Sequence, residues 1–257
     1  MYSLEQIKSE YPESLSQQHT KNLLVEYLQY ELLDSIYKQK GSEKLSFIGG
    51  TAIRIVYGTE RFSEDLDFDN FGLSYKDFSG LLEKVITDME NKGYKVEYRF
   101  IEKGAYHCYI KFPDLLFDNN LSGNNDEKIL IRVDTVRKKK LAETKSFLLN
   151  KFGVYRRITT NTESVILVQK IIAILDRKRV KGRDFYDVSF LLGKTLPDYQ
   201  YLEKTRKINK EKLKSLLIKR IDEINLKQLS VDVQPFLINP DDIERVLSFR
   251  EFIEQRL

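Results

Sequence analysis

Residues 47–69 read FIGGTAIRIVYGTERFSEDLDFD, and this stretch decides the fold. The apolar run from Leu45 to Ile48 predicts a short strand, and the two glycines after it predict a tight turn without β-carbons. Residues 51–57 then follow helical spacing, with Thr51 in position to cap the helix N-terminus. A strand that ends in glycines before a helix leaves backbone N–H groups exposed, which suits a phosphate.

Acidic and apolar side chains alternate in residues 65–69, so the aspartates share one face of a predicted strand. Carboxylates two residues apart on one face repel each other unless a cation lies between them. Asp65 and Asp67 therefore predict a metal site. Oxygen-only ligands favour a hard cation, Mg²⁺ (or Mn²⁺), which keeps coordination positions open for substrate phosphates.

The composition is that of a globular protein, with 257 residues of which 41% are hydrophobic and 32% charged. No apolar run approaches the roughly 20 residues that span a bilayer, and the first residues lack the layout of a secretory signal. The single cysteine, Cys108, excludes an intramolecular disulfide and supplies too few thiolates for a zinc site. We therefore expect a cytoplasmic protein with no membrane partner.

The periodicity predicts an α+β fold in which a mixed domain precedes a helical one. The pattern becomes helical after Asn150, so we predict domains at residues 1–150 and 151–257. The elements predicted in the first domain are helices over residues 11–40 and 75–92 and strands over residues 94–101, 105–112 and 128–136.

A further candidate carboxylate is Asp134, on the predicted strand 128–136. A lone aspartate on a strand is usually a surface residue, and Asp134 joins the site only if its strand lies beside residues 65–69. In that case Asp65 and Asp67 would bind two metal ions, with Asp134 near the attacking hydroxyl. Such a set predicts in-line nucleotidyl transfer, in which metal ions hold the entering and leaving oxygens.

Three charged residues of the second domain are also candidates. Lys170 lies on a helix that is apolar almost all round, and a buried lysine needs an anionic partner. That partner is either a structural carboxylate or a nucleotide phosphate. Asp184 and Asp187 lie three residues apart in the first turn of the next helix, where the helix dipole favours negative charge. This local stabilisation accounts for only one of them.

These motifs resemble the AbiEii/AbiGii toxin family over residues 45–195. The residues that carry the resemblance are GGTAIR at 49–54, RFSEDLDF at 61–68, Lys170, and RDFYD at 183–187. The family comprises nucleotidyltransferase-like toxins of abortive-infection and toxin–antitoxin systems, within the DNA polymerase β-type superfamily. The resemblance implies a mixed-sheet nucleotidyltransferase domain, then a helical domain, with the active site in the groove between them.

The residue pattern and the resemblance together define a candidate site. The expected catalytic residues are Asp65, Asp67, Asp134, Lys170, Asp184 and Asp187, of which Asp65, Asp67 and Asp134 would bind the metal. The expected nucleotide-binding residues are Gly49, Gly50, Thr51, Arg54, Ser63 and Lys170.

The predicted reaction transfers NMP from an NTP donor to an RNA acceptor. Some members of the family modify the 3′ acceptor end of tRNA, and the basic clusters at 137–140, 177–183 and 219–220 suit a nucleic-acid backbone. The resemblance also implies a cognate antitoxin. The alternatives are transfer to a small molecule or protein hydroxyl, or an inactive protein that binds RNA. Two strand aspartates argue against the inactive alternative, because carboxylates repel RNA phosphates.

Overall fold

The computed structural model describes residues 1–257, and the chain divides into two compact units. The first unit comprises residues 1–52, 63–140 and 144–160, and the second comprises residues 53–62, 141–143 and 161–257. The prediction of an entirely helical pattern after Asn150 is wrong for residues 154–161, which form a strand. This strand pairs with residues 45–48 and so extends the sheet of the first unit.

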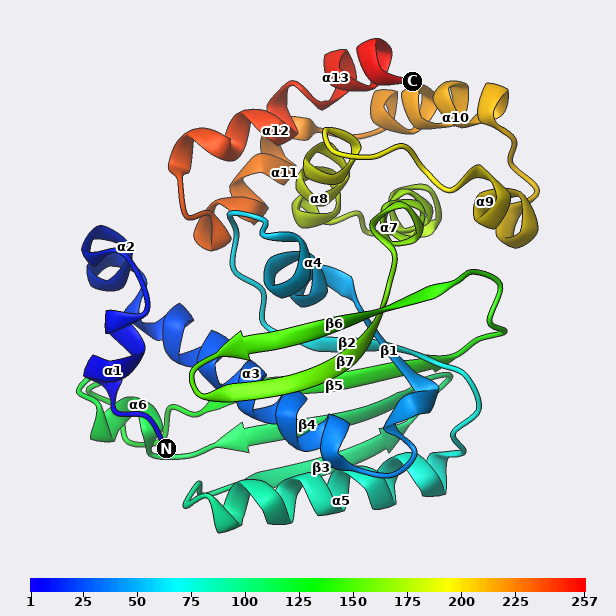
Figure 1. Ribbon diagram of the computed structural model, residues 1–257. Helices are drawn as coiled ribbons and strands as arrows, with labels where there is room; N and C mark the ends of the chain where they lie inside the picture. Colours follow the sequence, from blue (N-terminus) through cyan, green and yellow to red (C-terminus); the bar gives the residue numbers. More distant parts are fainter. The chain divides into compact units, whose positions relative to one another are not determined.

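A mixed sheet of seven strands forms the core of the first unit (Figure 1). The strands are β1 (Leu45–Ile48), β2 (Leu66–Asn70), β3 (Glu97–Glu102), β4 (Tyr106–Phe112), β5 (Ile129–Arg137), β6 (Thr144–Lys151) and β7 (Val154–Asn161). Their order across the sheet is β3-β4-β5-β2-β1-β7-β6. β2 runs antiparallel to β1 and parallel to β5, so strands distant in sequence become neighbours at the centre of the sheet.

The sheet of the first unit has one apolar and one polar face. Phe47, Phe68 and Val133 are buried on the apolar face. Helix α3 (Thr20–Lys38) contacts β5, and helix α5 (Tyr75–Asn91) contacts β4. The aspartates of β2 and β5 lie on the polar face because side chains alternate along each strand. The helices of this unit are α1 (Leu4–Ser9), α2 (Glu13–Gln18), α3 (Thr20–Lys38), η1 (Ser42–Lys44), α5 (Tyr75–Asn91) and α6 (Leu115–Asp118).

Helix α4 (Gly49–Tyr57) follows β1, as the spacing predicts. Its residues 49–52 belong to the first unit and its residues 53–57 to the second. Helix α5 also forms as predicted. Ser74 caps it in a reciprocal pair with Asp77, and Gly93, with φ of 92°, follows its end.

The second unit is built around α7 (Glu163–Asp176) and α8 (Gly182–Leu192), which pack against each other. The remaining helices are α9 (Tyr199–Arg206), α10 (Lys210–Asp222), α11 (Leu226–Val233), η2 (Gln234–Phe236), η3 (Pro240–Ile243), α12 (Glu244–Leu247) and α13 (Phe249–Arg256). Asn225 separates α10 from α11 by capping the second of them. None of the helices in the chain is both long enough and apolar enough to cross a membrane.

The turn between β6 and β7 places a bulky residue in the left-handed region. Phe152 and Gly153 have φ of 55° and 73°, and phenylalanine rarely adopts such a conformation. The Phe152 ring is 2% exposed, and its centroid lies 5.3 Å from the rings of both Tyr27 and Tyr30. Aromatic packing therefore offsets the strain of the turn.

We expect Phe152→Ala to lower the free energy of unfolding by about 3–5 kcal/mol, because it opens a cavity among the tyrosines. Urea denaturation followed by circular dichroism measures the change. The matched control is Tyr155→Ala in the same hairpin. Tyr155 is 71% exposed, so its loss should change stability by less than about 0.5 kcal/mol. Equal effects of the two substitutions would contradict this account of the turn.

Candidate functional site

The polar face of the sheet brings the predicted carboxylates of the first unit together. Asp67 on β2 pairs with Asp134 on β5 in the parallel ladder, so their side chains project to the same face from neighbouring strands. Asp65, two residues before Asp67, hydrogen-bonds with Arg132, two residues before Asp134. The strand adjacency on which a role for Asp134 depends is therefore present. The role itself stays a prediction.

The glycine turn lies directly against Asp67. Ile48 at the end of β1 is the antiparallel partner of Asp67, and Gly49 follows with φ of 79°. A β-carbon on Gly49 would lie 2.3 Å from Oδ2 of Asp67, well inside van der Waals contact. Both the backbone conformation and the neighbouring carboxylate therefore require glycine here. The turn and the carboxylate form one site.

Helix α4 begins at Gly49, so the prediction that Thr51 caps the helix is wrong. Thr51 lies inside the first turn, and its hydroxyl donates to the backbone carbonyl of Asp65. This bond joins the start of the helix to the segment that carries the carboxylates. The helix N-terminus, with its unpaired N–H groups and positive dipole end, therefore lies beside Asp67.

The structure places three other predicted nucleotide-binding residues, Gly50, Ser63 and Arg54, in contacts with other parts of the chain. Gly50 is buried in the first turn of α4. The backbone carbonyl of Ser63 accepts a hydrogen bond of 2.8 Å from the Gln29 amide. Arg54 donates to the carbonyl of Thr59 at 2.8 Å, and its guanidinium lies 5.1 Å from the centre of the Phe62 ring. Arg54 thus orders the loop after α4, and its predicted contact with a nucleotide stays a prediction.

Two basic side chains hold the carboxylates in position. Arg132 bonds Asp65 through Nε at 3.2 Å and through Nη2, and it lies 3.7 Å from Asp134. The hydrogen bond with Asp65 raises the pKa of Arg132. His107 on β4 lies directly opposite Asp134, with Nδ1 2.8 Å from its Oδ1. The sequence alone indicates no role for His107, because no local pattern shows that β4 pairs with β5 so that His107 lies opposite Asp134.

The three aspartates of this site suit a hard cation, but two of them contact different basic or polar side chains. Asp65, Asp67 and Asp134 offer only carboxylate oxygens, as Mg²⁺ prefers. In this arrangement no three acidic, histidine or cysteine side chains converge on a point that could hold a metal ion. Asp65 faces Arg132 and Asp134 faces His107, and both carboxylates are partly exposed, by 25% and 16%. A cation shared by the three would therefore take the place of Arg132 at Asp65.

The remaining predicted residues form an ion network inside the second unit. Lys170 Nζ on α7 lies 3.0 Å from Asp184 and 2.8 Å from Asp187, both on α8. Asp187 also accepts two hydrogen bonds of 2.6 Å from the guanidinium of Arg61. Arg177 pairs with Asp184 at 2.5 Å. Asp184 and Asp187 are therefore more than helix-terminal charges, because each neutralises cations from elsewhere in the chain.

Arg61 is the member of this network that sequence reasoning missed. It is 1% exposed and Asp187 is fully buried, so the pair lies away from solvent. Burial by itself raises the pKa of Asp187, but the charges of Arg61 and Lys170 outweigh it and hold the pKa below its ordinary value. Of the two partners considered for Lys170, the structure contains the carboxylates. A contact with phosphate stays a prediction.

The family profile described as "Nucleotidyl transferase AbiEii toxin, Type IV TA system" matches residues 31–254. No curated protein matches the chain. Among solved structures, JHP933 from Helicobacter pylori is similar with 19% identity and a TM-score of 0.58, over 91% of each chain. MenT4, a nucleotidyltransferase toxin from Mycobacterium tuberculosis H37Rv, has 13% identity and a TM-score of 0.61, over 99% of this chain and 90% of its own. At these identities the two structures show a shared fold.

We expect Gly49→Ala to lower the free energy of unfolding by about 1–3 kcal/mol, because alanine is strained at this φ and its β-carbon displaces the Asp67 carboxylate. Thermal unfolding measures the loss. Gly80→Ala is the control, since Gly80 lies in α5 with open space where a β-carbon would sit. That change should leave stability unaltered or raise it by up to about 1 kcal/mol. Equal tolerance of the two alanines would contradict the close packing at Gly49.

We expect Arg61→Met to lower the free energy of unfolding by about 3–5 kcal/mol, because it leaves the buried charge of Asp187 without its bidentate partner. Denaturant titration of the purified protein measures the change. The double variant Arg61→Met/Asp187→Leu removes both charges and should recover most of the loss. A double variant no more stable than the single one would contradict this role of the pair.

Proposed function

The chain belongs to the family of AbiEii nucleotidyltransferase toxins of type IV toxin–antitoxin systems, and from this we propose that it transfers a nucleoside monophosphate from an NTP to the 3′ end of an RNA, with tRNA as the acceptor. The observation that carries the proposal is the packing of the Gly49 turn on Asp67, with Asp134 beside it on the next strand. One place on the first unit thus combines a helix N-terminus for phosphates with carboxylates for a cation.

In the proposed reaction the acceptor hydroxyl attacks the α-phosphorus of the NTP. A bond forms between that oxygen and phosphorus, the bond to the bridging β-phosphate oxygen breaks, and pyrophosphate leaves. The N–H groups at the start of α4 would bind the triphosphate, and Asp65, Asp67 and Asp134 would hold Mg²⁺ or Mn²⁺. When bound, the cation supplies charge neutralisation at the entering and leaving oxygens.

The neighbouring basic residues have roles that follow from their contacts. His107 contacts Oδ1 of Asp134 at 2.8 Å, and the other oxygen, Oδ2, lies 3.7 Å from Arg132. Once Arg132 turns away, Oδ2 would accept the proton of the attacking hydroxyl. Arg132 neutralises Asp65 before substrate arrives. It is 34% exposed, and it would turn to the triphosphate once the cation occupies Asp65, because a guanidinium pairs as readily with phosphate as with carboxylate.

The RNA acceptor is supported by charge on the same unit. The run Arg137-Lys138-Lys139-Lys140 is exposed and begins at the last residue of β5, the strand that carries Asp134. Lys138 pairs with Asp69 at 2.6 Å. Exposed cations near the site of transfer suit the phosphates of a nucleic acid. The family's place in toxin–antitoxin systems also supports an antitoxin as the cognate partner.

The test incubates purified protein with each labelled NTP separately, Mg²⁺ and total tRNA. We expect label in RNA with the wild type, and a loss of rate of about 100-fold or more with Asp67→Asn or Asp134→Asn, which keep the side-chain shape but remove the charge. Asp126→Asn, an exposed aspartate of the first unit, is the matched control and should retain full activity.

Two outcomes would contradict the proposal. Label in a product of low mass or in protein, with tRNA unlabelled, would assign a different acceptor. No transfer with any NTP would remove the catalytic function. Chelation by EDTA tests the metal requirement in the same assay, and we expect activity to return when Mg²⁺ or Mn²⁺ is added in excess.

A further inference from the structure

The polar face of the sheet continues beyond the carboxylates to the edge strand. Across β4 and β3, the partner of Asp134 is His107 and the partner of His107 is Ile101. In the neighbouring row, the partner of Arg132 is Tyr109 and the partner of Tyr109 is Arg99. The side chains of each row share one face, because paired residues on neighbouring strands project to the same side. The carboxylate site is therefore continuous with the outer part of the sheet.

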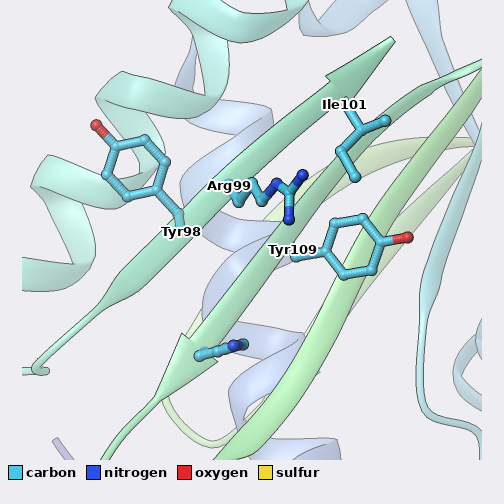
Figure 2. Close-up of a pocket in the computed structure, with 5 residues that line it drawn as sticks. Tyr98, Arg99, Ile101 and Tyr109 are labelled. Atoms are coloured by element: carbon cyan, nitrogen blue, oxygen red, sulfur yellow. The ribbon is translucent and has the colours of Figure 1, made fainter. Parts of the chain in front are cut away.

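This outer part contains a hollow of about 350 Å³ lined by Tyr98, Arg99, Ile101, Tyr109 and Lys111. Figure 2 shows Arg99, Ile101 and Tyr109 gathered over β3 and β4, whereas Tyr98 projects past the outer edge of β3. Arg99 and Lys111 are exposed, and Tyr109 and Ile101 are half-buried. We call Arg99, Ile101, Tyr109 and Lys111 the β3–β4 platform. It combines an aromatic ring, an aliphatic side chain and two cations, and no acidic side chain lines it.

We propose that the β3–β4 platform binds the single-stranded 3′ end of the RNA acceptor, an assignment that rests on the proposed function. A base would stack on the ring of Tyr109 beside Ile101, and the adjoining phosphates would pair with Arg99 and Lys111. Aromatic rings flanked by cations on an open sheet bind single strands in this way, because every base has a stacking face and every nucleotide carries a phosphate.

The position of the platform relative to Asp134 fits this ligand. Neighbouring strands lie about 4.8 Å apart, so two strand spacings place Ile101 about 10 Å from Asp134. About one or two nucleotides of an extended strand cover this distance. A base held on the platform would therefore leave the terminal hydroxyl at Asp134, where the proposed transfer takes place.

The platform is also rigid and selective for charge. Tyr109 is half-buried and lies opposite Arg132 in the β4–β5 ladder, and Arg132 in turn bonds Asp65, so the ring is packed on a regular strand and loses little conformational entropy on binding. Arg99 and Lys111 are positively charged, so they favour a phosphate backbone over a peptide that has no acidic side chains. A duplex does not offer its base faces for stacking, and the platform is therefore suited to an unpaired end.

The test measures binding of a short, fluorescein-labelled single-stranded RNA by anisotropy at several salt concentrations, without NTP. We expect Tyr109→Ala to weaken binding by about 5-fold or more and Tyr109→Phe to retain it, because the ring and not the hydroxyl stacks. For Arg99→Ala/Lys111→Ala we expect weaker binding and a slope of log K against log salt reduced by about 0.7 for each cation removed.

Matched controls come from other surfaces of the same unit. Tyr155→Ala removes a tyrosine that is 71% exposed on β7, and Lys76→Ala/Lys84→Ala removes two exposed lysines that line a different hollow beside α5. These variants should bind the RNA as the wild type does. In the transfer assay, Arg99→Ala/Lys111→Ala should raise KM for the acceptor and leave KM for the NTP unchanged.

Each contrary result has a separate meaning. If wild type binds no single-stranded RNA, or if platform and control variants bind equally, the platform assignment is overturned even where label transfer proceeds. Tighter binding of blunt duplex, or of a peptide added along the free edge of β3, would also overturn it. Loss of transfer in the wild type with platform-dependent RNA binding intact would instead contradict the proposed function and leave the binding site in place.

Discussion

The contact between Gly49 and Asp67 is the constraint on which the rest of the first unit depends. A β-carbon at residue 49 has no room beside Oδ2 of Asp67, so the backbone of the turn and the acidic strand can approach only through glycine. That approach lets β1 continue straight into α4 while β2 pairs alongside it. The N-terminus of α4, with its positive dipole end, therefore lies next to the negative charge of Asp67.

A sheet face with several carboxylates is electrostatically unfavourable unless nearby groups compensate it. In the first unit the compensation comes from the adjacent strands. Arg132 lies two residues from Asp134 and reaches Asp65, and His107 reaches Asp134 from β4. Arg132 supplies positive charge and His107 a hydrogen-bonding partner, and the carboxylates of Asp65 and Asp134 are 25% and 16% exposed. The same arrangement leaves Asp65 open to exchange, because its partner is a side chain at the surface and not a buried one.

In the second unit the paired charges are buried, whereas the carboxylates of the first unit are partly exposed. Arg61 and Asp187 are almost completely buried, and Lys170 completes the network from α7. A buried pair of this kind costs much to break and adds little beyond what apolar packing would supply. Its two hydrogen bonds of 2.6 Å restrict the segment with Arg61 to a position against α8. The bidentate geometry of the guanidinium reinforces that restriction.

Much of the fold was predictable because the relevant signals are local. The strand, glycine turn and helix over residues 45–57, the alternation of β2 and β5, and the capped helix α5 all follow from periods and turn residues within a few positions of each other. The hairpin of β6 and β7 escaped prediction. Its burial pattern is irregular, and its turn depends on distant tyrosines around Phe152.

The sequence by itself determined the family, the turn that precedes the carboxylates, and the acidic strand, since each is written in consecutive residues. Only the tertiary structure decided which strand lies beside β2, that His107 meets Asp134, and that Arg61 neutralises Asp187 across 126 positions of sequence. Such pairs depend on the register of a whole sheet and on the packing of whole helices. No local pattern specifies these, because the free energy that selects them is shared among many distant contacts.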